Sequence, residues 1–83
     1  MKITLKYFAS IREAVGQGGE DWQSQAVTVG DLRDELLARG EPYAQALARG
    51  RAVRMALNQV LCDEQTRLSE DCEVAFFPPV TGG

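Results

Sequence analysis

The sequence predicts a single α+β domain in which a mixed β-sheet of about five strands packs against a helix on one face. Two observations predict this fold class. Apolar and polar residues alternate near both ends of the chain, as in half-buried strands, and leucines recur at helical spacing between residues 28 and 40. The length of 83 residues, with 45% hydrophobic and 25% charged residues, is that of one globular domain with a modest core.

The first strand is expected over residues 2–8. The positions expected to face the core are Ile3, Leu5 and Tyr7. Ser10 opens the sequence Ser-Ile-Arg-Glu, which is typical of a capping box, so we expect a short helix that starts there and closes at Gly16. After a glycine-rich turn, residues 20–27 are expected to return as the second strand of a hairpin.

The central helix is predicted between Thr28 and Gly40. Thr28 opens Thr-Val-Gly-Asp, a second N-cap pattern, and a glycine at position 40 favours the helix end. The leucines at helical spacing are Leu32, Leu36 and Leu37. Pro42 suits the first turn of another short helix, which should stop at Gly50. The apolar residues of that second helix would be Ala44, Leu47 and Ala48.

Three further strands are expected over residues 52–57, 60–62 and 73–77, with a tight connection at Asn58-Gln59. A polar segment, residues 63–71, would be anchored by Leu68. Pro78-Pro79 ends the last strand because proline has no N–H to donate. The first and last strands are both apolar on one face, so we expect them side by side at the sheet centre. This is the organisation of a ubiquitin-like β-grasp fold.

Composition argues against several kinds of function. The net charge of −3 disfavours a nucleic-acid partner, and no apolar run approaches the length of a membrane span. Without a signal-peptide pattern, the expected location is cytoplasmic. Histidine is absent, which removes the commonest general base and metal ligand. Cys62 and Cys72 form no metal-ligand pattern and are expected to be reduced and partly buried, with no assigned role.

Other motifs are better explained by structure than by chemistry. The glycines at 16–19 lack the Gly-Lys-Ser/Thr ending of a phosphate loop and predict a hairpin turn. The nearby cations Arg49, Arg51 and Arg54 could meet an acidic partner, but a solvated surface is the favoured interpretation. Neighbouring acids such as Glu20 and Asp21 would point to opposite faces of a strand, so they do not converge on one atom.

The last six residues are the strongest functional signal. Gly82 and Gly83 have no Cβ atoms, so this end could enter a narrow tunnel with its carboxylate first. Pro78 and Pro79 would stiffen the exit from the sheet, and residues 80–83 would span about 13 Å when extended. We therefore expect a domain at 1–79 and a flexible tail at 80–83, comprising Val80, Thr81, Gly82 and Gly83.

The run Glu73 to Gly83, with its Phe-Phe-Pro-Pro-Val-Thr-Gly-Gly ending, resembles the C-terminal signature of the small subunits of molybdopterin synthase. Tyr7-Phe8-Ala9, Ile11-Arg12-Glu13 and Leu57-Asn58-Gln59 support the resemblance. Gly-Gly alone would be weak, because ubiquitin-like modifiers and the thiamin sulfur carrier share it.

The resemblance implies a carrier rather than an enzyme that acts alone. A partner activating enzyme would use ATP and Mg to adenylate the Gly83 carboxylate, and a sulfur donor would convert it to a thiocarboxylate. The tail would then enter the large synthase subunit and give its sulfur to cyclic pyranopterin monophosphate, in molybdenum cofactor biosynthesis. In this family two small subunits flank a dimer of large subunits. No cofactor or metal would be bound by this chain itself.

Three alternatives stay open at the sequence level. The chain could carry sulfur for thiamin or for tRNA thiolation, although Phe-Phe-Pro-Pro argues against the thiamin carrier. It could be a protein modifier joined through Gly83 to lysines, or an interaction domain with an inert end.

The sequence also predicts a surface for the large subunit. Phe8 and Phe77 fall outside the inward strand positions, so we expect an exposed apolar patch with Leu61 nearby, next to Pro78 and Pro79. The alternative is that both rings complete a small core.

Overall fold

The computed structural model describes residues 1–79. The elements in chain order are β1 (Lys2–Tyr7), α1 (Ala9–Val15), β2 (Gly19–Gln23), α2 (Val29–Leu37), α3 (Tyr43–Ala46), β3 (Arg54–Leu57), β4 (Val60–Cys62) and β5 (Glu73–Phe77). The expected division between a domain at 1–79 and a tail at 80–83 is not tested, because residues 80–83 lie outside the described part.

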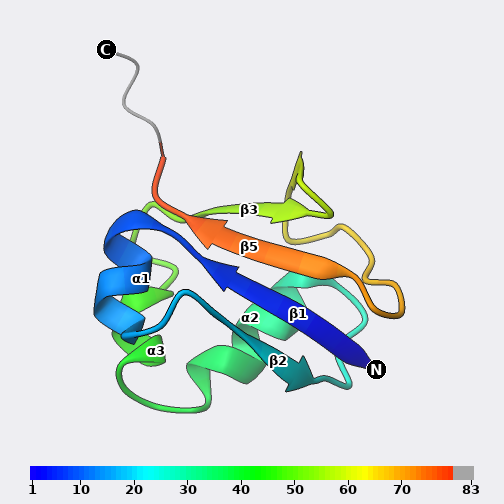
Figure 1. Ribbon diagram of the computed structural model, residues 1–83, viewed down its shortest axis with the longest axis horizontal. Helices are drawn as coiled ribbons and strands as arrows, with labels where there is room; N and C mark the ends of the chain where they lie inside the picture. Colours follow the sequence, from blue (N-terminus) through cyan, green and yellow to red (C-terminus); the bar gives the residue numbers. More distant parts are fainter. Residues whose placement is uncertain (80–83) are drawn as a thin grey trace.

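The five strands form one mixed sheet in the order β2-β1-β5-β3-β4. β1 and β5 are parallel neighbours at its centre, and the other pairs are antiparallel. The helices lie together on one side of this sheet and leave its other side open (Figure 1). The predicted β-grasp architecture is therefore confirmed, including the pairing of the first and last strands. No helix in residues 1–79 has both the length and the apolar character to cross a membrane.

The core lies between the sheet and α2. The side chains with no exposed surface include Ile3, Leu5, Val29, Leu32, Leu36, Leu47, Val74 and Phe76. Each such side chain stabilises the fold by roughly 1.5–3 kcal/mol through removal of apolar surface from water. The predicted core positions on the first strand and on the central helix are confirmed, with Leu37 and Leu68 half-buried at the edge of the core.

Both ends of α2 follow the sequence prediction. The Thr28 hydroxyl accepts a hydrogen bond of 3.2 Å from the Asp31 amide, and the Asp31 carboxylate accepts one of 3.2 Å from the Thr28 amide. This is a complete capping box, which satisfies two amides at a helix start. After the helix, Gly40 has a φ of +83°, a conformation that only glycine adopts without strain.

The predicted cap at Ser10 is wrong. Helix α1 begins at Ala9, and Phe8 occupies the N-cap position without any side-chain cap. The Phe8 amide still donates to the Phe76 carbonyl, while the Phe8 carbonyl accepts from the amides of Ile11 and Arg12. The chain thus passes directly from the sheet into the helix, which leaves no room for a separate cap. The predicted closure at Gly16 is confirmed, with φ of +91°.

Three predicted strands are longer than the observed ones, although the first, expected over residues 2–8, differs from β1 by Phe8 alone. The second was expected over residues 20–27, but β2 ends at Gln23, because Ser24 then turns away and its hydroxyl donates to Glu35 on α2 at 2.6 Å. The strand expected over residues 52–57 starts only at Arg54. Arg54 is opposite Phe77, and the prolines that follow Phe77 offer no amide to earlier residues. The two-residue connection at Asn58-Gln59 is confirmed.

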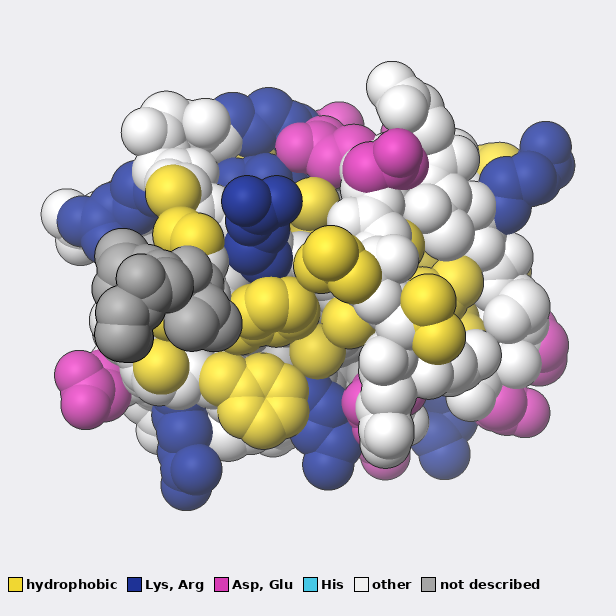
Figure 2. Space-filling view, turned by 90° about the horizontal axis from the view of Figure 1, so that it is seen from above, with side chains coloured by type: hydrophobic (Ala, Val, Ile, Leu, Met, Phe, Trp, Pro, Cys, Tyr) yellow, Lys and Arg dark blue, Asp and Glu magenta, His cyan; other side chains and the backbone are white. Residues whose placement is uncertain are grey.

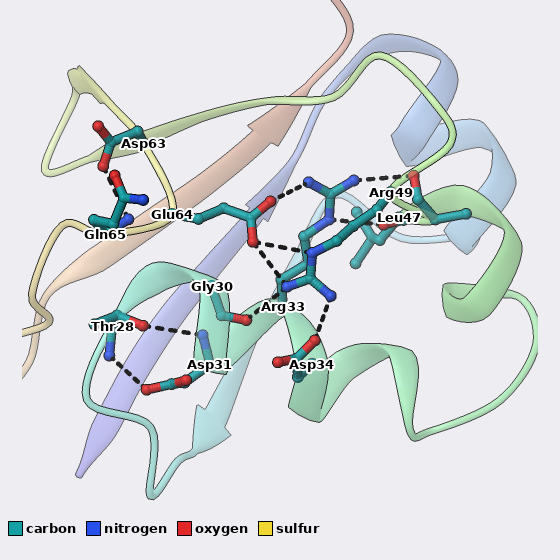
Figure 3. A network of polar contacts seen from close by, with 11 residues as sticks. Thr28, Gly30, Asp31, Arg33, Asp34, Leu47, Arg49, Asp63, Glu64 and Gln65 are labelled. Atoms are coloured by element: carbon teal, nitrogen blue, oxygen red, sulfur yellow. Dashed lines mark hydrogen bonds and ion pairs between the residues drawn. The ribbon is translucent and has the colours of Figure 1, made fainter.

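The short helix expected from Pro42 to Gly50 is also shorter in the structure, where α3 ends at Ala46. The buried guanidinium of Arg33 takes the next two carbonyls, with 2.8 Å from Nε to the Leu47 oxygen and 3.0 Å to the Ala48 oxygen. Arg33 also donates to Glu64 at 3.1 Å (Figure 3). An arginine on α2 therefore ends α3 and joins it to the segment before β5.

Arg49 is exposed, as expected for a solvated surface, but its guanidinium is paired within the chain. Its guanidinium donates to Glu64 at 2.8 Å, to the Gly30 carbonyl at 3.1 Å and to Asp34 (Figure 3). Arg51 and Arg54 are exposed, as expected. Glu64 is thus shared by Arg33 and Arg49, which ties α2 to two loops.

The two candidate caps give a direct stability test. Replacing Thr28 by Ala removes the hydroxyl that accepts from the Asp31 amide, while the backbone amide of residue 28 can still donate to Asp31. Loss of this cap should lower the free energy of unfolding by about 1 kcal/mol. Ser10→Ala is the matched control and should change it by no more than about 0.5 kcal/mol, because Ser10 is exposed and caps nothing. Urea denaturation of both variants measures the difference. Equal losses would contradict the assignment of the cap to Thr28.

The Glu64 network should make stability depend on acid pH. Hydrogen bonds from Arg49 hold the pKa of Glu64 below its ordinary value of 4.5. A lowered carboxyl pKa stabilises the fold above the unfolded pKa, and this contribution is lost as the pH falls through the folded pKa. Glu64→Gln should therefore cost about 1–3 kcal/mol at neutral pH and progressively less below pH 4.5.

The control for this effect is Glu13→Gln, at an exposed position on α1. Thermal unfolding of both variants between neutral and acid pH measures the two profiles. A loss for Glu64→Gln that stays constant with pH would contradict a role for its charge.

Candidate functional site

The end of β5 is where the predicted tail leaves the sheet. Phe76 pairs with Tyr7 of β1, and Phe77 pairs with Arg54 of β3, so β5 has neighbours on both sides up to its end. Pro78 and Pro79 follow and are half-buried. Because neither proline can donate a hydrogen bond, the ladder stops there. The predicted tail residues Val80, Thr81, Gly82 and Gly83 lie outside the described residues, so their roles stay predictions.

An apolar surface lies beside this strand end on the open side of the sheet. We call it the outer-face patch and define it by Phe8, Ala56, Leu61, Ala75 and Phe77. Phe8 is 49% exposed and Leu61 is 65% exposed, while Phe77 is half-buried. The two rings therefore do not complete the core. Figure 2 shows hydrophobic side chains gathered on the face seen from above, with Lys and Arg side chains among and around them.

Strand register explains how the outer-face patch forms. Ala75 of β5 is opposite Lys6 on one side and Ala56 on the other, and Ala56 is opposite Leu61. These four residues therefore form a row across β1, β5, β3 and β4. The neighbours of Ala75 on β5, Val74 and Phe76, have no exposed surface and belong to the core on the opposite side.

The small side chains at the centre of this row leave a shallow hollow of about 550 Å³. Its apolar lining includes Phe8, Ala56, Ala75 and Phe77, and its charged lining is Lys6, Arg12 and Glu73. Sequence reasoning missed Ala56 and Ala75, although strand alternation along residues 54–57 and 73–77 contains the signal. It placed Phe8, Phe77 and Leu61 on one surface. Phe8 and Phe77 line this hollow, and Leu61 lies opposite Ala56 at the β4 end of the row.

On the opposite side of the sheet, the polar side chains around buried Tyr7 bond to one another and hold the fold together. The Tyr7 hydroxyl donates a hydrogen bond of 2.8 Å to Glu20, which also accepts from Tyr43 at 3.1 Å and Arg39 at 2.9 Å. Burial and the bond to Glu20 raise the pKa of Tyr7 far above its ordinary value. Asp21 faces the other way and is 4.0 Å from Lys2, so the two adjacent acids do not converge, as predicted.

The described residues offer little chemistry of their own. Among residues 1–79, no three His, Cys, Asp or Glu side chains lie close enough together to hold a metal ion. Cys72 is buried and Cys62 is half-buried, and both are free thiols. Burial raises the pKa of the Cys62 thiol, which disfavours the reactive thiolate. The feature that these residues do present is the exposed outer-face patch beside the end of β5.

Comparison with known proteins agrees with this architecture. A model of the ThiS family matches residues 5–83. The molybdopterin synthase sulfur carrier subunit of Escherichia coli K12 is 40% identical over 98% of this chain and 99% of that protein. Small archaeal modifier protein 3 of Haloferax volcanii is 33% identical over the full length of both.

Among solved structures, a complex of subunits 1 and 2 of molybdopterin-converting factor from Helicobacter pylori contains a chain with the same fold. The TM-score is 0.69 at 23% identity, and the match covers 100% of both chains. The family model covers all five strands except the first residues of β1, and the relatives match over nearly their whole length. The chain therefore belongs to the ThiS family.

Proposed function

We propose that this chain is the sulfur carrier subunit of molybdopterin synthase. The observation that carries the proposal is the arrangement at the end of β5. A central strand stops at Phe77-Pro78-Pro79 beside an exposed apolar patch, so a docked partner would receive the chain that follows at a fixed position. The 40% identity to a sulfur carrier subunit over almost the whole chain supports the same function.

The reactive group in this proposal is the carboxylate of Gly83. An activating enzyme uses ATP and Mg to form the Gly83 acyl-adenylate with release of pyrophosphate. Sulfur from a donor then displaces AMP and leaves a thiocarboxylate. The thiocarboxylate gives its sulfur to cyclic pyranopterin monophosphate within the large subunit, and the carboxylate is regenerated for another cycle. The carrier domain supplies docking and reach, and the partners supply the catalytic side chains.

The outer-face patch is the proposed contact with the large subunit, in a heterotetramer with two carriers. Its apolar side chains Phe8 and Leu61 are exposed in the isolated chain. Contiguous exposed apolar patches on small proteins commonly mark sites where another protein binds. The complex of subunits 1 and 2 solved for the Helicobacter pylori factor supports a partner of this kind. Gly82 and Gly83 add no side-chain bulk where the tail would enter that partner.

A protein modifier is the second candidate, favoured by the 33% identity to a small archaeal modifier protein. Mass spectrometry of the chain produced with its activating enzyme separates the possibilities. A mass gain equal to the exchange of one oxygen for sulfur indicates a carrier, and lysine adducts on other proteins indicate a modifier. An unchanged mass would contradict both and would leave an interaction domain.

Changes in the tail should remove function without affecting the fold. Removal of Gly83 shortens the reach by about 3.5 Å, and one added residue moves the carboxylate past the adenylation site. Either change should abolish or sharply reduce thiocarboxylate formation, measured by mass spectrometry. Thermal unfolding should stay unchanged, because the core side chains lie between residues 3 and 76.

The limiting variant lacks both Gly82 and Gly83. Normal molybdopterin formation by this variant would refute the carrier mechanism. Failure of the variant to fold would refute the separation between domain and tail.

Phe8→Ala tests the contact surface. Loss of an aromatic side chain from the centre of an interface costs about 1–4 kcal/mol, so the dissociation constant for the large subunit should rise at least about fivefold. Val27→Ala is the matched control, because Val27 is 51% exposed and lies outside the outer-face patch. Isothermal titration calorimetry with both variants measures the constants. Equal affinities would exclude Phe8 from the interface.

A further inference from the structure

The basic side chains divide into two groups. Four of the nine form ion pairs within the described chain: Lys2, Arg33, Arg39 and Arg49. The other five, Lys6, Arg12, Arg51, Arg54 and Arg67, have no acidic partner among residues 1–79 and are exposed. These five positive charges are free of ion pairs within residues 1–79, so they can pair with acids of another molecule without breaking a contact of the fold.

Three of the five surround the outer-face patch. Lys6 and Arg12 line the hollow beside Phe8. Arg54 of β3 is opposite Phe77, the residue of β5 that comes directly before the two prolines. Glu73 is the single acid among the described residues that line this hollow. The rim of the patch is therefore predominantly basic, and Figure 2 shows Lys and Arg side chains close to the apolar centre.

This distribution contrasts with the chain as a whole. The net charge is −3, so the surface away from the patch is more negative than the total suggests. A wholly apolar partner would remove water from these cations without compensation, which is costly. A partner edge with carboxylates would compensate them, and it would be attracted to this face while the rest of the chain repels it.

We propose that the outer-face patch is matched by a partner surface that is apolar at its centre and acidic at its rim, with Arg54 as the steering cation beside the start of the tail. The inference deepens the proposed function, since it specifies the chemistry of the large-subunit surface. Charges at the rim of an interface act chiefly on the association rate and on its salt dependence. Steering by Lys6, Arg12 and Arg54 would orient the encounter so that the outer-face patch and the end of β5 face the partner.

The experiment measures association rates of the full chain with the purified large subunit from the same genome, by stopped-flow fluorescence. Arg54→Glu and Lys6→Glu are compared with Arg67→Glu, which makes the same charge change at an exposed position in the loop between β4 and β5. Arg54→Gln provides a neutral intermediate, and circular dichroism establishes that each variant is folded. Rates are recorded from about 0.02 M salt, where screening is weak, to about 0.3 M.

Reversal at Arg54 or Lys6 should slow association by about three- to tenfold at low salt and flatten its salt dependence, and Arg54→Gln should fall between. Arg67→Glu should stay close to wild type. If Arg54→Glu and Lys6→Glu behave like Arg67→Glu while Phe8→Ala still weakens binding, the acidic rim is refuted and the proposed function stands. Faster association of Arg54→Glu would also refute it. No binding of the wild-type chain would refute the proposed function itself.

Discussion

β1 and β5 pair in parallel at the centre of the sheet, from Thr4 opposite Glu73 to Tyr7 opposite Phe76. This pairing joins the first and last strands of the chain, so the chain adds β2 beside β1 and must then cross over the sheet to add β3 and β4 on the other side of β5. The crossover carries α2 onto one side and leaves the other side open. It also brings Phe8, just after β1, to the same end of the sheet as Phe77. The apolar patch and the starting point of the tail thus share one origin.

Successive side chains of a strand point to opposite sides of the sheet, so one side can form the core while the other binds a partner. On β5, Val74 and Phe76 are fully buried against α2, whereas Ala75 and Phe77 face the open side. A substitution on the open side can therefore change binding while most of the core remains intact. The proposed carrier depends on this separation, because its partners must handle the chain beyond Pro79 without loosening the domain that presents it.

Local patterns predicted the elements whose determinants are close in sequence. Thr28 and Asp31 are three residues apart and form the expected capping box. The same kind of pattern at Ser10 failed, because the Phe8 backbone is already bonded to Phe76, 68 residues away in sequence. Ion pairs were less predictable still: Arg33 and Arg49 meet at Glu64 only after folding. Among the site residues, the exposure of Phe8 followed from alternation, whereas the hollow above Ala56 and Ala75 depends on the register of three strands.

The pairing of charges bears on how such a small acidic domain can serve more than one partner. Arg33, Arg39 and Arg49 are engaged in ion pairs on the helix side, where they join loops and helices. Burying or pairing a cation there stabilises the fold but removes it from recognition. Of the five cations without an acidic partner among residues 1–79, Lys6, Arg12 and Arg54 stand around the outer-face patch at the end of β5. In the proposed function, an activating enzyme and a large subunit would both receive this same strand end. Each partner can then be selected by a shared apolar contact and discriminated by how its own carboxylates match the rim.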